Sequence, residues 1–189
     1  VRVSDVVLDG QARAAFQVDT TSGTGATQLS LPRVHMVTNA AAAIAVAGVV
    51  GVDLEAALVA LSTAAVSGMR MEMLTSASGA TIVNDAYNAN PTSMIAALDA
   101  LAAMDADRRI AVLGRMAEID DVEAAHREVA AHALDRDLEL VAVGTSDYGM
   151  EPFDDPVAAI GRLGPRDVVL VKASRSAGLE RVVAQLAGP

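Results

Sequence analysis

Residues 80–94 read ATIVNDAYNANPTSM, and this stretch decides how the second half of the chain is expected to fold. It begins with a compact apolar strand over residues 80–84, passes through a polar turn, and enters a helix over residues 91–104. Pro91 suits the first turn of that helix, where a missing N–H breaks no hydrogen bond. The stretch is therefore interpreted as the first strand–turn–helix step of an α/β domain.

The same alternation continues toward the end of the chain. Further strands are expected over residues 109–114, 138–144 and 167–172. Further helices are expected over residues 121–134, 155–162 and 177–186. Such a succession predicts a Rossmann-like, doubly wound α/β fold with a mainly parallel sheet.

The first part of the chain has a different pattern. Alternating apolar and polar residues predict short strands over 3–8, 14–19 and 27–31, with turns at 9–10 and 22–25. Helices are expected over 36–50 and 54–62, the second capped by Asp53. This part is a small antiparallel meander plus helices. A charged, Met-rich link over residues 67–74 separates it from the α/β part, so we predict domains at 1–68 and 69–189.

Composition excludes several classes of protein. The net charge of −10 and the scattered basic residues argue against a protein that binds nucleic acid. The absence of cysteine excludes disulfides and thiolate metal sites and is compatible with a cytoplasmic location. The longest apolar stretch, residues 40–52, is too short to cross a bilayer, which needs about 20 residues.

Polar segments follow all four strands of the predicted parallel sheet, where doubly wound proteins bind ligands. They are residues 85–90, 114–118, 144–146 and 172–176. Asp85, Tyr87, Asn88 and Asn90 have groups that bind ribose or a base, although the same residues would also form a turn and a helix cap. Lys172 and Arg175 have the charge to bind a carboxylate or phosphate, or they are an ordinary solvated pair.

Other sites are not expected. His126 and His132 are six residues apart, which does not suit metal ligands one helical turn apart. The sequence contains neither G-x-x-x-x-G-K-[ST] nor a G-x-G-x-x-G after a strand. Gly23-Thr24-Gly25 is interpreted as a hairpin turn between meander strands.

Five segments, in order, resemble those of the Mur ligase family, most closely the branch that adds D-alanyl-D-alanine. They are HMVTNA at 35–40, VNDAYNANPTSM at 83–94, IAVLGRMAE at 110–118, His126, and VLVKASR at 169–175. The resemblance covers essentially the whole chain.

The resemblance implies an ATP-dependent amide ligase of peptidoglycan precursor synthesis. Such an enzyme joins D-alanyl-D-alanine to UDP-N-acetylmuramoyl-tripeptide through an acyl phosphate, with Mg²⁺ as a second cofactor. Residues 1–68 would be the tail of the central ATPase domain, and 69–189 the C-terminal Rossmann-like domain. We expect the chain to begin inside a longer protein whose N-terminal and central domains complete the site, and to be inactive by itself without a phosphate-binding loop.

The resemblance also implies residue roles. Asn39 should lie near the adenine, and Arg70 and Asp85 should reach the nucleotide, with Asp85 on the ribose. Tyr87, Asn88 and Asn90 should shape the same edge. The candidates for binding D-alanyl-D-alanine are Lys172, Ser174, Arg175 and His126, the last of which would contact the substrate or orient a neighbour.

The sequence departs from the family pattern at a few positions. Arg33, Met36 and Met69 differ from the residues usual there, and Arg115 replaces a common acid. A non-catalytic module that binds a nucleotide or peptide, and another amide ligase such as folylpolyglutamate synthase, remain as alternatives.

Overall fold

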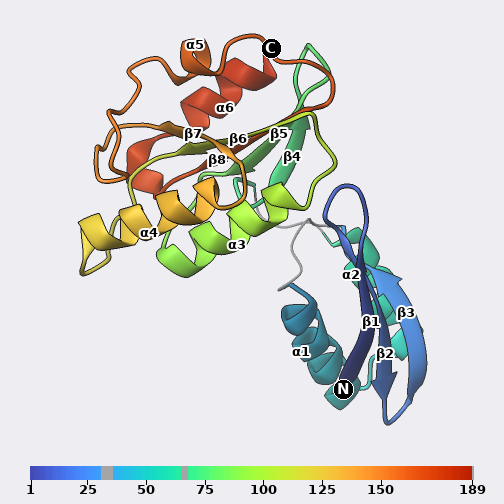
Figure 1. Cartoon of the computed structure of the whole chain (residues 1–189). Coiled ribbons are helices and arrows are strands. Elements are labelled where there is room, and N and C mark those ends of the chain that lie inside the picture. The colour runs from blue at the N-terminus through green and yellow to red at the C-terminus, as the bar shows by residue number, and fades with distance from the viewer. Residues whose placement is uncertain (31–35, 65–67, 189) are drawn as a thin grey trace. The chain divides into compact units, whose positions relative to one another are not determined.

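The computed structural model describes residues 1–30, 36–64 and 68–188. The chain divides into two compact units, residues 1–66 (unit 1) and 67–189 (unit 2), which are described separately. Unit 1 holds a three-stranded sheet and unit 2 a five-stranded one (Figure 1). The predicted fold class, a mainly parallel α/β sheet preceded by a small antiparallel meander with helices, is confirmed.

Unit 1 is an antiparallel sheet packed against two helices. Its strands are β1 (Arg2–Leu8), β2 (Ala14–Thr20) and β3 (Gly23–Gln28), paired in that order. Its helices are α1 (Met36–Val49) and α2 (Leu54–Thr63), and Asp53 caps α2 as predicted by accepting the Ala56 N–H. The core joins alternate residues of β2 to the helices, and consists of Ala14, Phe16, Val18, Leu29, Val37, Ala40, Ile44 and Leu58.

The predicted third strand was placed too late in the chain. Strand β3 spans Gly23–Gln28, so the glycines that were interpreted as a turn lie inside the strand, while Leu31 lies outside the described residues. The reason is close packing by α2: a Cβ added at Gly25 would lie 2.5 Å from Leu58 Cδ1. Glycine is used here because a helix approaches the strand backbone.

The sheet of unit 2 has the strand order β4-β5-β8-β6-β7. The strands are β4 (Glu72–Thr75), β5 (Thr81–Asp85), β6 (Arg108–Leu113), β7 (Glu139–Ala142) and β8 (Asp167–Lys172). β4 pairs with β5 antiparallel, and the other four strands are parallel. β4 was not predicted, because three of its four residues lie within the segment that was interpreted as a link.

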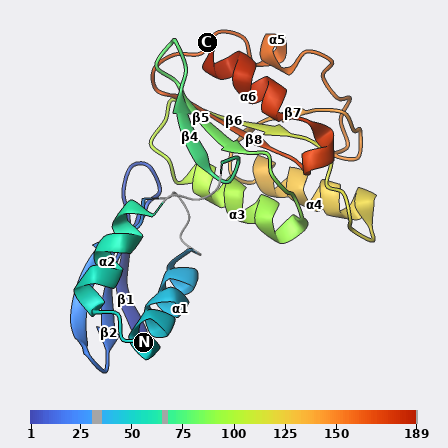
Figure 2. The ribbon, with the colours of Figure 1, turned by 180° about the vertical axis from the view of Figure 1, so that it is seen from behind.

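Helices cover both faces of this sheet (Figures 1 and 2). α3 (Pro91–Ala102) and α4 (Val122–Leu134) lie on one face, and α5 (Pro156–Ile160) and α6 (Glu180–Ala187) lie on the other. Alternate strand residues therefore point into two apolar layers. The layer under α5 and α6 includes Ile82, Ile110, Val112, Val169, Val171, Ile160, Val182, Val183 and Leu186.

The last helix begins later than predicted. A short 3-10 turn over Arg175–Ala177 follows β8, and Gly178 adopts a left-handed φ of 64° before α6 starts at Glu180. The chain thus forms a compact bend after Lys172 before it enters the helix. This bend keeps residues 173–176 at the carboxyl end of β8.

Candidate functional site

The site is the edge of unit 2 where the parallel strands end. Asp85 pairs with Lys172 in the register of β5 and β8, and Lys172 pairs with Leu113 of β6. Because β4 runs in the opposite direction, the loop before it, residues 68–71, lies at the same edge. The sheet thus brings together segments that are far apart in the sequence, as predicted for a doubly wound fold.

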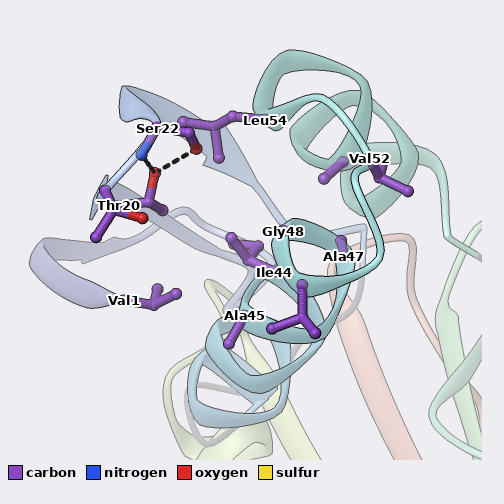
Figure 3. Close-up of a pocket in the computed structure, with 12 residues that line it drawn as sticks. Val1, Thr20, Ser22, Ile44, Ala45, Ala47, Gly48, Val52 and Leu54 are labelled. Atoms are coloured by element: carbon purple, nitrogen blue, oxygen red, sulfur yellow. Dashed lines mark hydrogen bonds between the residues drawn. The ribbon is translucent and has the colours of Figure 1, made fainter.

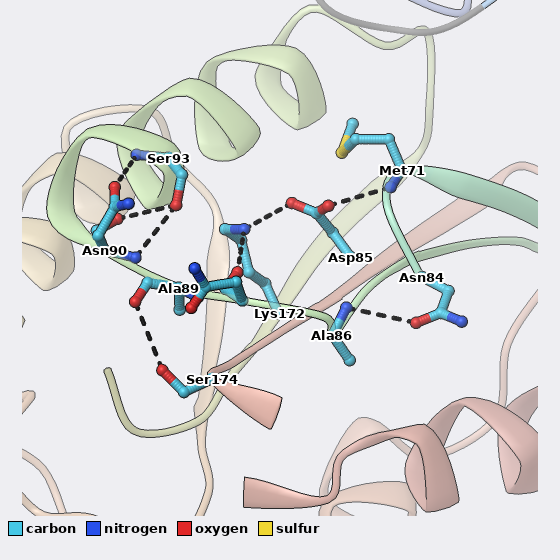
Figure 4. Close-up of polar contacts among 10 residues, drawn as sticks. Met71, Asn84, Asp85, Ala86, Ala89, Asn90, Ser93, Lys172 and Ser174 are labelled. Carbon is cyan, nitrogen blue, oxygen red and sulfur yellow. Dashed lines mark hydrogen bonds and ion pairs between the residues drawn. The ribbon is translucent and has the colours of Figure 1, made fainter. Parts of the chain in front are cut away.

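A buried ion pair lies at the centre of this edge (Figure 4). Lys172 Nζ donates to Asp85 Oδ2 at 2.6 Å and to the Asn88 carbonyl oxygen at 2.8 Å. The other oxygen of Asp85 accepts the Met71 N–H at 3.0 Å. Asp85 is 3% exposed and Lys172 is 2% exposed, so both charges are directed into the protein.

An exposed cationic group lies beside the pair. The Arg70 guanidinium lies 4.3 Å from the centroid of the Tyr87 ring, and that of Arg175 lies 5.7 Å from it. Tyr87 is 40% exposed, and the contact of Arg70 with its ring is a cation–π interaction. Within residues 1–30, 36–64 and 68–188, no ion pair joins Arg70, Arg115 or Arg175 to a carboxylate. Their charge is therefore directed at solvent, where it can meet an anion.

The loop over residues 114–118 is held by two predicted substrate ligands. Ser174 Oγ accepts the Ala117 N–H at 2.8 Å, and its own N–H donates to the Arg115 carbonyl at 3.0 Å. His126 Nε2 accepts the Met116 N–H at 3.0 Å, so Nδ1 carries the proton and donates to the Val122 carbonyl.

The side chain of His126 is fully buried, packed edge-on against Tyr148 with ring centroids 4.8 Å apart. The ring thus orients the neighbouring loop and does not face solvent in this structure, and a contact of His126 with the substrate stays a prediction. The other part of that expectation, an orienting role, fits these contacts.

Two predicted residues have local structural partners. Asn90 Oδ1 accepts the Ser93 N–H and Ser93 Oγ accepts the Asn90 N–H, which together form a capping box at the start of α3. Asn88 Oδ1 accepts the Ala89 N–H, while its backbone carbonyl binds Lys172. The capping interpretation of this segment is therefore confirmed, and the functional one stays a prediction.

Residues that the sequence did not single out complete the site. Glu72 Oε2 accepts from the Met69 N–H and from Asn84 Nδ2, and so fixes the start of β4. Tyr148 donates its hydroxyl to the Gly114 carbonyl at 2.7 Å. Nothing in the local sequence pattern signals these contacts, because each joins segments that the fold brings together.

Burial of Tyr148 raises the pKa of its phenol, and the charge of Asp147 raises it further. A folded pKa above the unfolded value means that this group's contribution is complete below pH 10 and is lost as pH rises from there. We therefore expect the urea midpoint of unit 2 to be steady up to about pH 10 and to fall as the pH rises further. The Ile82 and Ile110 methyl NMR signals would report it. Tyr148→Phe should flatten this dependence, and an unchanged slope would contradict the assignment.

Unit 1 contains the remaining predicted site residue. Asn39 lines a cavity of about 220 Å³ whose other walls are mostly apolar, including Leu29, Ala43 and Leu61. Met36 also lines it, and Asn39 Nδ2 lies 3.4 Å from Met36 Sδ. An amide at the wall of an apolar cavity suits an aromatic base with polar edges. Arg33 and His35 lie outside the described residues.

A second cavity in unit 1, of about 310 Å³, offers less chemistry (Figure 3). It is lined mainly by apolar residues of α1 and of the start of α2, such as Ile44 and Leu54. The hydroxyls of Thr20 and Ser22 lie in it but are 3.0 Å apart and hydrogen bond to each other. No charged side chain is among the residues that line this cavity.

The described residues contain neither a candidate metal cluster nor a membrane-spanning helix. No three His, Asp or Glu side chains within them lie together as metal ligands. None of the helices in residues 1–30, 36–64 and 68–188 has the length and hydropathy to cross a membrane.

Comparison with known proteins identifies the family. Residues 69–188 match the family described as Mur ligase, glutamate ligase domain. This match covers more than half of the chain, and it coincides with the unit that carries the doubly wound sheet and the cationic edge. The chain therefore belongs to the Mur ligase family.

Comparison with individual proteins shows which members of the family the chain is similar to. The chain is 38% identical to UDP-N-acetylmuramoyl-tripeptide–D-alanyl-D-alanine ligase of Mycobacterium tuberculosis, over 94% of its own length and 42% of that protein. It is 34% identical to the Bacillus subtilis protein of the same name, over 80% of this chain and 38% of that one. The crystal structure of MurF from Acinetobacter baumannii has a TM-score of 0.84 at 27% identity, and the match covers 98% of this chain and 44% of that one. The chain thus spans less than half the length of these relatives.

Proposed function

We propose that the chain is part of an ATP-dependent ligase that joins D-alanyl-D-alanine to UDP-N-acetylmuramoyl-tripeptide in the cytoplasm, for peptidoglycan synthesis. The observation that carries the proposal is the group of Arg70, Tyr87 and Arg175, whose guanidiniums have no carboxylate partner among the described residues. All substrates of this reaction are anions or carry a carboxylate, which guanidinium groups bind in a planar, two-bonded geometry. The names of the relatives support the same reaction.

Each unit, taken by itself, has groups that would suit part of a nucleotide. In unit 1, Asn39 and the apolar cavity beside it fit the adenine base. In unit 2, Arg70 and Tyr87 fit the phosphates and ribose. ATP would supply the phosphoryl group that activates the tripeptide carboxylate. Contacts of Asp85, Asn88 and Asn90 with the nucleotide stay predictions.

The dipeptide carboxylate would be bound by Arg175. Its guanidinium is exposed at the end of β8, whereas Lys172 and Ser174 of the same segment are buried and engaged with the backbone. Arg175 Nη1 donates to Met69 Sδ at 3.2 Å, a weak contact that leaves most of its donors for a ligand. Ser174 and His126 would act behind it by fixing residues 114–118.

The residues described do not fit the Mg²⁺ that the family resemblance implies, since they contain no candidate cluster of metal ligands. No chemical step is therefore assigned to a metal held by this chain. In our proposal, Mg²⁺ would be bound by other parts of a ligase like the relatives. This chain spans less than half the length of those relatives.

In the complete ligase, Arg175→Ala should raise the KM for D-alanyl-D-alanine by at least about tenfold and leave the KM for UDP-N-acetylmuramoyl-tripeptide nearly unchanged. Loss of a bidentate partner weakens binding of the dipeptide carboxylate alone. Steady-state release of ADP at varied dipeptide concentration measures this. Arg166→Ala is the matched control, because it removes an exposed guanidinium paired with Asp105 and Asp107.

The results of this experiment distinguish a wrong reaction from a wrong role for Arg175. If ADP release does not depend on D-alanyl-D-alanine at all, the proposed reaction is wrong, and a binding module or another amide ligase becomes the better interpretation. If the reaction depends on the dipeptide but Arg175→Ala leaves its KM unchanged, the reaction stands and the role of Arg175 is wrong.

A further inference from the structure

The chain contains a single lysine, Lys172, and its ammonium is inside the protein. Two of its hydrogen bonds go to different segments, to the Asp85 carboxylate at the end of β5 and to the Asn88 carbonyl in the turn before α3. A lysine that bound a ligand directly would have to be reachable from solvent, whereas Lys172 is 2% exposed. The charge of Lys172 is used to join parts of the protein.

Asp85 extends this connection to a third segment. Its second oxygen accepts the N–H of Met71, and the Met69 carbonyl accepts the N–H of Tyr87. Met69 and Met71 have left-handed φ angles of 65° and 52°, which residues other than glycine rarely adopt. The loop over residues 69–71 is thus strained, and it persists because these bonds fix it.

The residue between the two strained methionines is Arg70, and the residue that bonds to the loop is Tyr87. The cation–π contact of 4.3 Å between Arg70 and Tyr87 joins residues 69–71 to residues 86–90. The buried Asp85–Lys172 pair bonds to both of these segments. We propose that Lys172 is a positioning residue: with Asp85 it fixes residues 69–71 and 86–90, so that Arg70 and Tyr87 are presented together to an anionic ligand. The identity of that ligand rests on the proposed function, but the positioning does not.

The first experiment needs no substitution. The folded 189-residue chain is treated with an amine-acetylating reagent, and its peptides are analysed by mass spectrometry. We expect the α-amino group to be acetylated while Lys172 reacts at least about a hundredfold more slowly, until urea exposes it. Because Lys172 is the only lysine, the signal has one source. Rapid acetylation of Lys172 in the folded chain, blocked by D-alanyl-D-alanine, would overturn the proposal in favour of a direct contact.

The second experiment measures the positioning itself. The Arg70 side-chain protons lie over the Tyr87 ring and should be shifted upfield in NMR spectra of the ligand-free chain. Lys172→Met should abolish this shift and accelerate amide exchange at Met71 and Tyr87 by at least about tenfold. Arg166→Met, which removes a cation at the opposite end of β8, should change neither. A general loss of stability in a chain that remains folded would not remove the Arg70 shift, so the shift reports positioning.

A chemical rescue covers the case in which Lys172→Met does not fold. Since the chain has no cysteine, Lys172→Cys introduces the only thiol, and aminoethylation in denaturant restores an ammonium on a side chain of similar length. Refolding of the aminoethylated chain with the Arg70 shift regained supports the proposal. Refolding without that shift, or a Lys172→Met chain that keeps both the shift and the slow exchange, overturns it.

Discussion

Replacing Lys172 by methionine should lower the free energy of unfolding of unit 2 by about 3–5 kcal/mol, because the substitution removes the ammonium that lies against the buried Asp85 carboxylate. The two side chains are 2% and 5% exposed, so water cannot replace the lost partner. Urea unfolding followed by the methyl NMR signals of Ile82 and Ile110 measures unit 2 by itself. Such a loss is a large part of the 5–15 kcal/mol that usually stabilises a domain.

Two further variants make this first result specific. Arg166→Met removes a cation from an exposed pair on the same strand and should leave the stability nearly unchanged. The double variant Asp85→Asn/Lys172→Met should recover much of the loss, since it removes both buried charges of the ion pair. A Lys172→Met chain that is as stable as the parent would show that the pair does not hold Asp85.

Gly114→Ala should destabilise unit 2 by about 1–3 kcal/mol, although it adds a single methyl group. The new Cβ would lie 2.8 Å from Ala173 Cβ and 3.0 Å from Leu179 Cδ1. The leucine methyl can rotate away, but Ala173 Cβ is attached directly to the backbone beside Lys172. The strand end would therefore have to shift, and residues 114–118 with it. The same urea and NMR measurement applies.

The compensating change for this second substitution is Ala173→Gly. The double variant Gly114→Ala/Ala173→Gly removes the Ala173 methyl, which is the atom nearest to the new Cβ, and should regain part of the stability. Gly48→Ala is the matched control, because Gly48 is in α1 and an added Cβ would meet nothing within 4 Å. That change should leave unit 1 unharmed or slightly more stable. Equal losses at Gly114 and Gly48 would show that close packing is not the cause.

Much of the fold could be predicted from the sequence, because local patterns specify it. β8 was predicted at its observed bounds, since the run of valines between Asp167 and Lys172 has no competing interpretation. β4 was missed because four residues carry little periodicity, and its partner β5 lies beyond a turn. The glycines of β3 were misinterpreted because their use depends on α2, which approaches from a distant part of the chain.

The site could be predicted as a region, but the roles of its residues could not. The ends of the strands correctly placed Asp85, Tyr87, Lys172 and Arg175 at one edge. Which of them face solvent depends on contacts over long separations, such as the bond between Lys172 and Asp85, which are 87 residues apart. Charge alone made Lys172 and Arg175 equivalent, whereas burial separates them.

The outer strands of the five-stranded sheet have a consequence for how the protein behaves in a crowded cell. β4 and β7 are each four residues long, so the two margins of the sheet present few unpaired backbone groups to a passing chain. Lateral strand addition, the usual start of amyloid-like growth, would gain little there. The brevity of the two strands therefore protects the sheet of unit 2 against aggregation through its edges.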